Sequence, residues 1–212
     1  SAMYGQMARD FGRRDLSLQL GKRFASGVDV SLSGFVGEGN RSDYVYRDFE
    51  DNRYRMNDNA ELNPMYANLG INYRKLALRF IYDNYRTTER DAFDIALGRA
   101  YQTDFVGMYA DASYGIELAK GLTLTPRLTF KRQMPWRALD EATEAYDSIF
   151  YDKRLDRTGA NLLLSWDLAE GVNVLVGGVA TFDHAVVQSN PGAGINALFG
   201  DSRTVDYENY AA

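Results

Sequence analysis

His184 is the only histidine among the 212 residues, and it directly follows Asp183. A carboxylate beside an imidazole is a pairing that general acid–base catalysis uses. No serine lies in a recognisable nucleophile elbow, and the chain has no cysteine to act as a nucleophile or to bind zinc. The pair is therefore interpreted as polar residues at the border of a strand and a loop, and we expect the protein not to be an enzyme.

Two further stretches contain residue types that bind ions in other proteins. Residues 57–61 (NDNAE) offer several oxygen ligands for calcium, but they lack the alternate ligands, the glycine and the terminal glutamate of an EF-hand loop. Residues 190–194 (NPGAG) lack the Lys-Ser/Thr pair that completes a phosphate loop. The first stretch is predicted to be a solvated acidic loop and the second a turn, with no metal and no cofactor.

Aromatic and arginine side chains cluster in two polar stretches, and these are the candidate ligand-binding residues. The candidates are Tyr44, Tyr46, Arg47, Tyr54 and Arg55 in the first stretch, and Trp136 and Arg137 in the second. Stacking rings and guanidinium groups together suit a flat or anionic ligand. The same side chains, with Phe49, Met134 and Pro135 beside them, also suit loops that pack against one another, and the sequence leaves both interpretations open.

The candidates lie between segments in which apolar and polar residues alternate with period two, as in β-strands. These segments are residues 16–21, 28–33, 67–73, 76–83, 106–117, 122–131, 160–168 and 172–183. They predict eight strands in four hairpins, each strand roughly 9 to 12 residues long, which suffices for a tilted strand to cross a bilayer. Two flanking strands are predicted at residues 3–9, with a turn at Gly12-Arg13-Arg14, and at residues 204–212.

The predicted connections are of two kinds. Within hairpins they are two or three residues long, at Ser26-Gly27, Arg74-Lys75, Lys120-Gly121 and Glu170-Gly171. Between hairpins they are long and polar, at residues 38–64, 86–104, 133–157 and 185–203. Structureless loops beyond about 12 to 15 residues are rare in compact soluble domains, whereas outer-membrane barrels combine short periplasmic turns with long outer loops.

Alternation alone does not say which face of a sheet is inside, because soluble and membrane barrels share the pattern. Aromatic residues near strand ends favour the membrane, where they form interfacial girdles: Phe24, Tyr73, Tyr82, Tyr114, Phe130, Trp166 and Phe182. Opposite charges on the polar face suit a wet lumen or a polar plug: Arg79, Asp83, Asp111, Arg127, Lys131, Asp167 and Asp183. The sequence therefore predicts an all-β, antiparallel transmembrane β-barrel of about ten strands, with residues 1–212 forming a single barrel domain or a fragment of one.

Composition excludes several other classes. The formal net charge is -5 and no basic stripe is present, so we expect no nucleic-acid partner. The chain has no cysteine and so no disulfide framework. It also lacks any run of about 18 apolar residues, so no transmembrane helix is predicted. The chain opens Ser1-Ala2-Met3-Tyr4, without the pattern of a secretory signal, so we expect the signal of an exported protein to lie outside this chain.

Three stretches carry a family resemblance: residues 128–131 (LTFK) leading into 134–136 (MPW), residues 174–178 (VLVGG), and residues 205–212 (VDYENYAA) after a long loop. Together these stretches resemble the barrel strands of TonB-dependent outer-membrane receptors. Members of that family close about 22 strands around an N-terminal plug. No plug pattern and no TonB box is found in this sequence, so the resemblance implies part of a larger barrel.

The resemblance also implies a function. We expect a receptor and transporter in the outer membrane of a Gram-negative bacterium, which takes up a scarce nutrient such as a siderophore-iron complex, a cobalamin or an oligosaccharide. The implied partners are membrane lipid and lipopolysaccharide, a small-molecule ligand, and TonB, acting through a plug that is not in this chain. The alternatives are a passive porin, a small structural or adhesive outer-membrane barrel, and a soluble lipocalin-like binder whose apolar face points inward.

Overall fold

The computed structural model describes residues 1–9, 11–57, 59–90, 96–138, 153–187 and 204–212. All of its regular elements are strands: β1 Ala2–Gln6, β2 Phe11–Arg23, β3 Val28–Gly39, β4 Val45–Arg47, β5 Arg53–Arg55, β6 Leu62–Tyr73, β7 Leu76–Glu89, β8 Tyr101–Tyr114, β9 Ile116–Ala119, β10 Leu122–Ala138, β11 Lys153–Ala169, β12 Val172–Val187 and β13 Thr204–Ala211. Within these ranges, no helix is long and apolar enough to cross a bilayer.

The strands form one large antiparallel meander, in the order β1-β2-β3-β6-β7-β8-β10-β11-β12-β13. The short β9 also pairs with β10, and β4 pairs with β5 in a separate two-stranded sheet. Every neighbouring pair is antiparallel, and long neighbours such as β11 and β12 stay in register from Lys153 to Asp167. The predicted all-β meander of about ten strands is confirmed.

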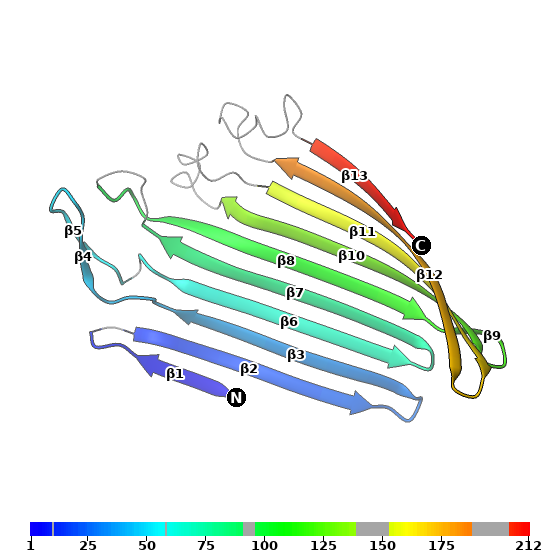
Figure 1. Cartoon of the computed structure of the whole chain (residues 1–212). Helices are drawn as coiled ribbons and strands as arrows, with labels where there is room; N and C mark the ends of the chain where they lie inside the picture. Colours follow the sequence, from blue (N-terminus) through cyan, green and yellow to red (C-terminus); the bar gives the residue numbers. More distant parts are fainter. Residues whose placement is uncertain (10, 58, 91–95, 139–152, 188–203) are drawn as a thin grey trace.

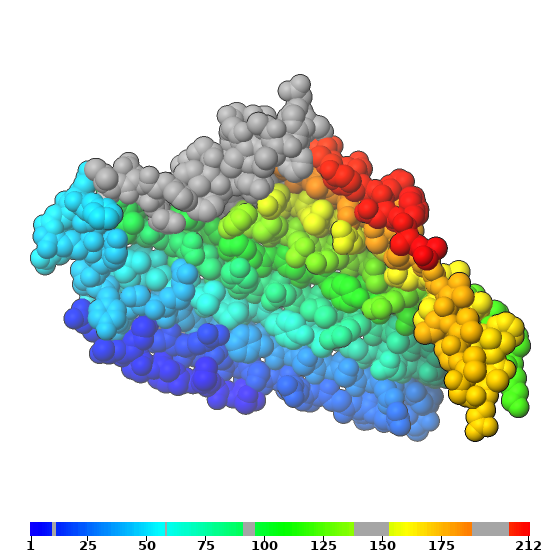
Figure 2. Space-filling model, viewed as in Figure 1, coloured from blue at the N-terminus to red at the C-terminus, as the bar shows by residue number. Residues whose placement is uncertain are grey.

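The predicted closure into a barrel is not observed in the described part of the chain. Figure 1 shows a curved, open sheet, with β1 at one margin and β13 at the other. The two strands remain apart in the space-filling view, where the blue and red ends occupy opposite margins (Figure 2). A barrel closes only when its edge strands pair with each other, at a stagger that suits the number of strands.

The tight turns gather at one end of the sheet, here called the turn end (Figure 1). The strand ends that the long connections join lie at the other end, here called the loop end. Each of the four predicted tight turns contains a residue with positive φ: Gly27 (85°), Arg74 (53°), Gly121 (77°) and Gly171 (76°). Two-residue hairpin turns need this left-handed conformation, which glycine adopts without steric penalty. Local chemistry at these turns therefore fixes the register of the hairpins.

At the loop end the strands differ from the prediction. Gly12, Arg13 and Arg14 do not form a turn but belong to β2, where Arg14 pairs with Glu38 of β3. Strands β10 and β11 are each 17 residues long, well beyond the predicted 9 to 12. The stretch 38–64 also contains the β4–β5 hairpin. Near the loop end, charged cross-strand pairs replace the apolar ones, so apolar alternation stops before these strands end. The alternation therefore predicted strands that are too short.

The two faces of the sheet differ in chemistry. Residues directly opposite in neighbouring strands project to the same side. One cross-strand row on the apolar face is Leu32, Leu69, Phe80, Ala110 and Phe130. A row on the polar face is Ser31, Gly70, Arg79, Asp111 and Thr129.

The apolar face is largely uncovered. Large side chains exposed on it include Leu16, Leu18, Leu20, Val36, Met65, Leu78, Phe80, Leu128, Leu162 and Val176. Leu128, in the middle of β10, is 62% exposed. Among the described residues the only buried apolar side chains are Ala60, Tyr101, Val106 and Val187. The sheet is thus a single layer, and its apolar side has no protein layer packed against it in the part of the chain that the structure describes.

Candidate functional site

On the apolar face, the apolar residues end at the loop end in a series of cross-strand ion pairs. Arg14 contacts Glu38, Arg86 Nε lies 2.9 Å from Asp104 Oδ1, and Arg132 Nε lies 2.6 Å from Asp156 Oδ1. Each pair joins residues that are directly opposite in the ladder, on the same side as the leucines. We call these six residues the rim ladder. It marks a sharp change from apolar to charged chemistry along one face.

The polar face carries its own ion pairs in the middle of the sheet. Arg157 donates to both carboxylate oxygens of Asp183, at 2.5 and 2.6 Å. Arg127 Nε lies 2.5 Å from Asp111 Oδ2, and Arg79 Nε donates to the Asn68 side chain at 3.1 Å. These arginines stay about half exposed, so the pairs need water or a polar partner beside them. The two faces therefore require opposite surroundings.

The predicted Asp183–His184 pair does not act as a unit. Consecutive strand residues point to opposite faces. Asp183 pairs with Arg157 on the polar face, whereas His184 Nδ1 lies 2.6 Å from Asp206 Oδ1 of β13 on the other. The interpretation as polar border residues stays a prediction, but the geometry separates the carboxylate and the imidazole that catalysis would need together.

No metal centre is found among the described residues: no group of three or more His, Asp or Glu side chains there could hold a metal ion. Asp58, one of the two carboxylates of the acidic stretch 57–61, lies outside the described residues, and so does the whole of the 190–194 turn. Neither of these two predictions is therefore tested by the structure.

The β4–β5 hairpin, which carries five of the predicted site residues, is organised around Asp48. This carboxylate is only 8% exposed and accepts hydrogen bonds from the backbone N–H groups of Glu50 (3.0 Å), Asn52 (2.9 Å) and Leu97 (3.3 Å). It also accepts from the Asn52 side chain and the Tyr54 hydroxyl, both at 3.1 Å. The bond to Leu97 ties the hairpin to the connection that leads into β8.

These contacts shift two pKa values outside the sheet. Burial by itself would raise the pKa of Asp48, but the hydrogen bonds from Asn52, Leu97 and Tyr54 outweigh it, so the pKa lies below the ordinary value. Burial, together with the hydrogen bond to the Asp48 carboxylate, raises the pKa of Tyr54. Hence Asp48 stays ionised and Tyr54 stays neutral at neutral pH.

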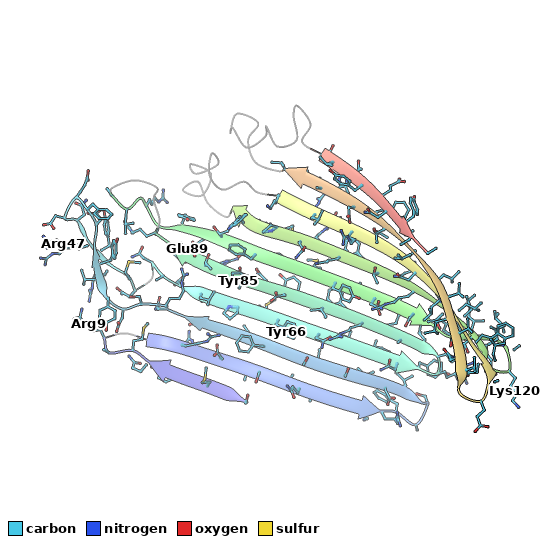
Figure 3. The ribbon with its side chains drawn as sticks, in the orientation of Figure 1. Arg9, Arg47, Tyr66, Tyr85, Glu89 and Lys120 are labelled. Carbon is cyan, nitrogen blue, oxygen red and sulfur yellow. The ribbon has the colours of Figure 1, made fainter. Side chains whose placement is uncertain are left out.

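Tyr44 and Tyr46 point outward from the hairpin, with 70% and 45% of their surface exposed. Arg47, labelled in Figure 3 at the tip of the hairpin, forms an ion pair with Asp51. These three predicted residues are exposed enough to contact a ligand.

Tyr54 has structural contacts instead, whereas Arg55 is exposed and is contacted through its backbone. The Tyr54 hydroxyl donates to Asp48, and the Arg90 guanidinium lies over the Tyr54 ring, 4.6 Å from its centroid. The backbone oxygen of Arg55 accepts from the Asn59 side chain at 2.8 Å. For Tyr54, the interpretation in which loop aromatics pack the loops together agrees with the structure.

Trp136 and Arg137 lie on β10, at a break in the register between β10 and β8. Trp136 has a φ of 54°, which is rare for a bulky residue. In sheet order β6, β7 and β8 stand between β10 and β3, the strand that leads into the hairpin (Figure 1). The two groups of predicted residues thus come from separate parts of the loop end.

Three residues that sequence reasoning missed surround Trp136. The Tyr85 and Phe105 rings stack with centroids 4.5 Å apart, Phe105 meets Trp136 edge to face at 6.1 Å, and Lys153 Nζ lies 5.1 Å from the Trp136 ring centroid. Tyr85 and Phe105 are direct partners in the β7–β8 ladder. Only the register brings them together. Both residues flank the predicted connection 86–104, outside the segments whose alternation predicted strands.

Comparison with known proteins gives no family. No protein-family model, no curated protein and no solved structure matches this chain. Function must therefore be inferred from the two faces, the rim ladder and the loop-end residues themselves. The resemblance to TonB-dependent receptors stays a prediction from sequence texture.

Proposed function

We propose that this chain is the barrel portion of an outer-membrane receptor that takes up a scarce nutrient. One observation carries the proposal: an exposed apolar face and a charged face lie back to back in a single sheet of long antiparallel strands. Lipid chains satisfy the first face and a water-filled or plugged lumen satisfies the second. In this proposal the sheet closes into a transmembrane barrel with further strands, and short turns face the periplasm.

The height of the apolar band supports a bilayer as its partner. On β11 the band extends from just below Asp156 to Trp166, which is ten residues, or about 34 Å of strand. A tilt of about 45° reduces this to ~24 Å along the membrane normal, close to the ~25 Å apolar band of outer-membrane barrels. A protein partner would have no reason to match this height.

The rim ladder supports the same orientation. The ion pairs of Arg86 and Arg132 lie directly beyond the apolar band of their strands, at the level that lipid headgroups would occupy. Guanidinium groups bind phosphate well, so the headgroups of lipid or lipopolysaccharide are suitable partners. The barrel then places the β4–β5 hairpin outside the cell, where a ligand arrives.

The proposed mechanism requires no covalent chemistry from this chain. Loop-end residues such as Tyr44, Tyr46 and Trp136 capture the ligand, and the polar face lines its route inward. TonB drives passage by pulling on a plug, as the resemblance implies. The main alternative is a passive porin, which the paired charges of the polar face, Arg157 with Asp183 and Arg127 with Asp111, would also suit.

Reconstitution tests the proposal. Chain purified in detergent is diluted into phosphatidylcholine vesicles and centrifuged through a density gradient, in parallel with dilution into plain buffer. Flotation with the vesicles and aggregation in buffer are expected. A chain that stays monodisperse in buffer, and does not float, refutes the lipid-facing interpretation. Steady large conductance across a planar bilayer, insensitive to added ligand, would favour the porin.

A further inference from the structure

At the loop end of β7, β8, β10, β11 and β12 the structure has a hollow of about 470 Å³. This volume falls within the ~300–1,000 Å³ typical of small-molecule sites. The residues that the argument uses from its lining are Asp83, Tyr85, Phe105, Gly107, Gln133 and Lys153. Figure 3 labels Tyr85 there, between Tyr66 in mid-sheet and Glu89 at the strand end.

The ring pairs beside the hollow form a fixed stacking surface. Tyr85 and Phe105 are parallel to within 6°, and Phe105 contacts the edge of Trp136 at an interplanar angle of 67°. Tyr85 nevertheless keeps 37% of its surface exposed, and Trp136 keeps 36%. Exposed ring area that is held in place by other rings binds a flat or ring-shaped apolar surface at low entropic cost.

The backbone at Trp136 supports a functional reason for this arrangement. A tryptophan with φ of 54° is strained, since its Cβ disfavours the left-handed region. Such strain persists where the surroundings enforce it, and it concentrates at binding sites. Here the strained residue directly follows Pro135 and lies where β10 breaks register with β8, so the break directs the indole towards Phe105 and Lys153.

Polar groups flank the rings on both sides. A cross-strand row on the polar face consists of Asp83 on β7, Gly107 on β8 and Gln133 on β10, which are direct partners. This row lies closer to the turn end than the pair Tyr85 and Phe105. Gly107 has no side chain, so the space between the Asp83 carboxylate and the Gln133 amide is open. On the other side, the Lys153 ammonium lies over the Trp136 ring. The hollow thus offers apolar ring faces, one anionic acceptor, one amide and two cations, Lys153 and Arg154. Arg154 Nε lies 3.3 Å from Asp156 Oδ2.

We propose that this hollow binds an acidic sugar, a pyranose ring that carries a carboxylate. The apolar face of the ring lies on Tyr85, its hydroxyl groups donate to Asp83 and hydrogen-bond with Gln133, and its carboxylate pairs with Lys153. A planar aromatic anion fits less well, because it has no hydroxyl group to donate to Asp83 or to hydrogen-bond with Gln133. The inference deepens the proposed function by naming the ligand class, and it rests on that function.

Tryptophan fluorescence measures this binding directly. The chain has two tryptophans, and Trp166→Phe leaves Trp136 as the only reporter. The detergent-solubilised variant is titrated with digalacturonic acid, with neutral galactobiose of the same ring shape, and with 1-naphthoate as a planar aromatic anion. We expect digalacturonic acid to bind about fivefold or more tightly than galactobiose, since only it pairs with Lys153.

Three further variants separate the roles of charge and stacking. Lys153→Met should abolish the preference for the acid, and Lys153→Arg should retain it. Phe105→Ala should weaken both sugars by about fivefold, because Tyr85 and Trp136 lose their support. Lys131→Met is the matched control, since this exposed lysine lies on the polar face of β10 outside the hollow. Unchanged circular dichroism and thermal unfolding confirm the fold of each variant.

The outcomes discriminate clearly. Tightest binding by 1-naphthoate, or an acid preference that survives in Lys153→Met, overturns the acidic-sugar inference. A chain that floats with vesicles but binds neither sugar overturns this inference and leaves the proposed function standing. A chain that binds digalacturonic acid yet stays monodisperse without detergent supports the hollow and overturns the membrane receptor.

Discussion

Leu162 and Leu163 are consecutive leucines on β11 with nearly equal exposure, 50% and 43%, on opposite faces of the sheet. Leu162 is paired with Pro126 and Gly178 on the apolar face, and Leu163 with Thr125 and Gly177 on the polar face. Replacing each by arginine therefore introduces the same charge at the same height, changing only the side of the sheet on which it lies.

The two variants should differ in their free energy of unfolding because the two arginines lie on opposite faces of the sheet. Leu162 is six residues from Asp156 and four from Trp166, which places it near the middle of the apolar band. Arginine at the midplane of a membrane barrel costs about 2–4 kcal/mol, whereas lumen-facing positions tolerate it. Leu162→Arg should lower the free energy of unfolding by about 2–4 kcal/mol, and Leu163→Arg by less than about 0.5 kcal/mol.

Equilibrium unfolding from phosphatidylcholine vesicles by guanidinium chloride, followed by tryptophan fluorescence, measures both values. Equal losses for the two variants would refute the assignment of the apolar face to lipid. A larger loss for Leu163→Arg would show that the polar face is the one that excludes water.

Three further predictions concern single elements of the sheet. The Asp48 carboxylate has a lowered pKa, so the stability that it contributes is complete above its ordinary pKa of about 3.9 and is lost as the pH falls through its folded-state value. Asp48→Asn should therefore raise amide exchange at Leu97 on the order of tenfold at pH 6 and remove this acid dependence; unchanged exchange would contradict the hydrogen bonding described. Gly171→Ala should lower the free energy of unfolding by about 1 kcal/mol, because φ is 76° and an added Cβ meets no atom within 4 Å, and Gly171→Asn should lower it by less; equal losses would mean that backbone strain is not the cause. Asp183→Asn should cost less than about 1 kcal/mol, since Arg157 is 51% exposed, and the loss should shrink at high salt in the same unfolding assay.

The sequence alone predicted the elements that depend on local chemistry. Glycines at residues 27, 121 and 171 determine tight turns, because few other residues accept positive φ. Period-two alternation predicted the strands through the apolar band, and with those turns it predicted a meander in which each strand pairs with the next. The two faces of opposite chemistry follow from the same alternation.

Residues at the loop end could not be placed in this way. There the strands continue through charged pairs such as Arg132 with Asp156, which have no apolar period to reveal them. Of the predicted site residues, Tyr44 and Tyr46 are exposed as a binding role requires, whereas Tyr54 is held by Asp48, a contact that the sequence pattern did not reveal.

Tertiary structure decided which side chains from different strands lie next to one another on the same face. The stacking of Tyr85 on Phe105 depends on which residue of β7 meets which residue of β8, and a shift by one residue would send one ring to the opposite face. The separation of Asp183 from His184 follows from the strand geometry that their adjacency in sequence conceals. Short-range preferences thus determine turns and strands, and only long-range pairing determines which side chains share a site.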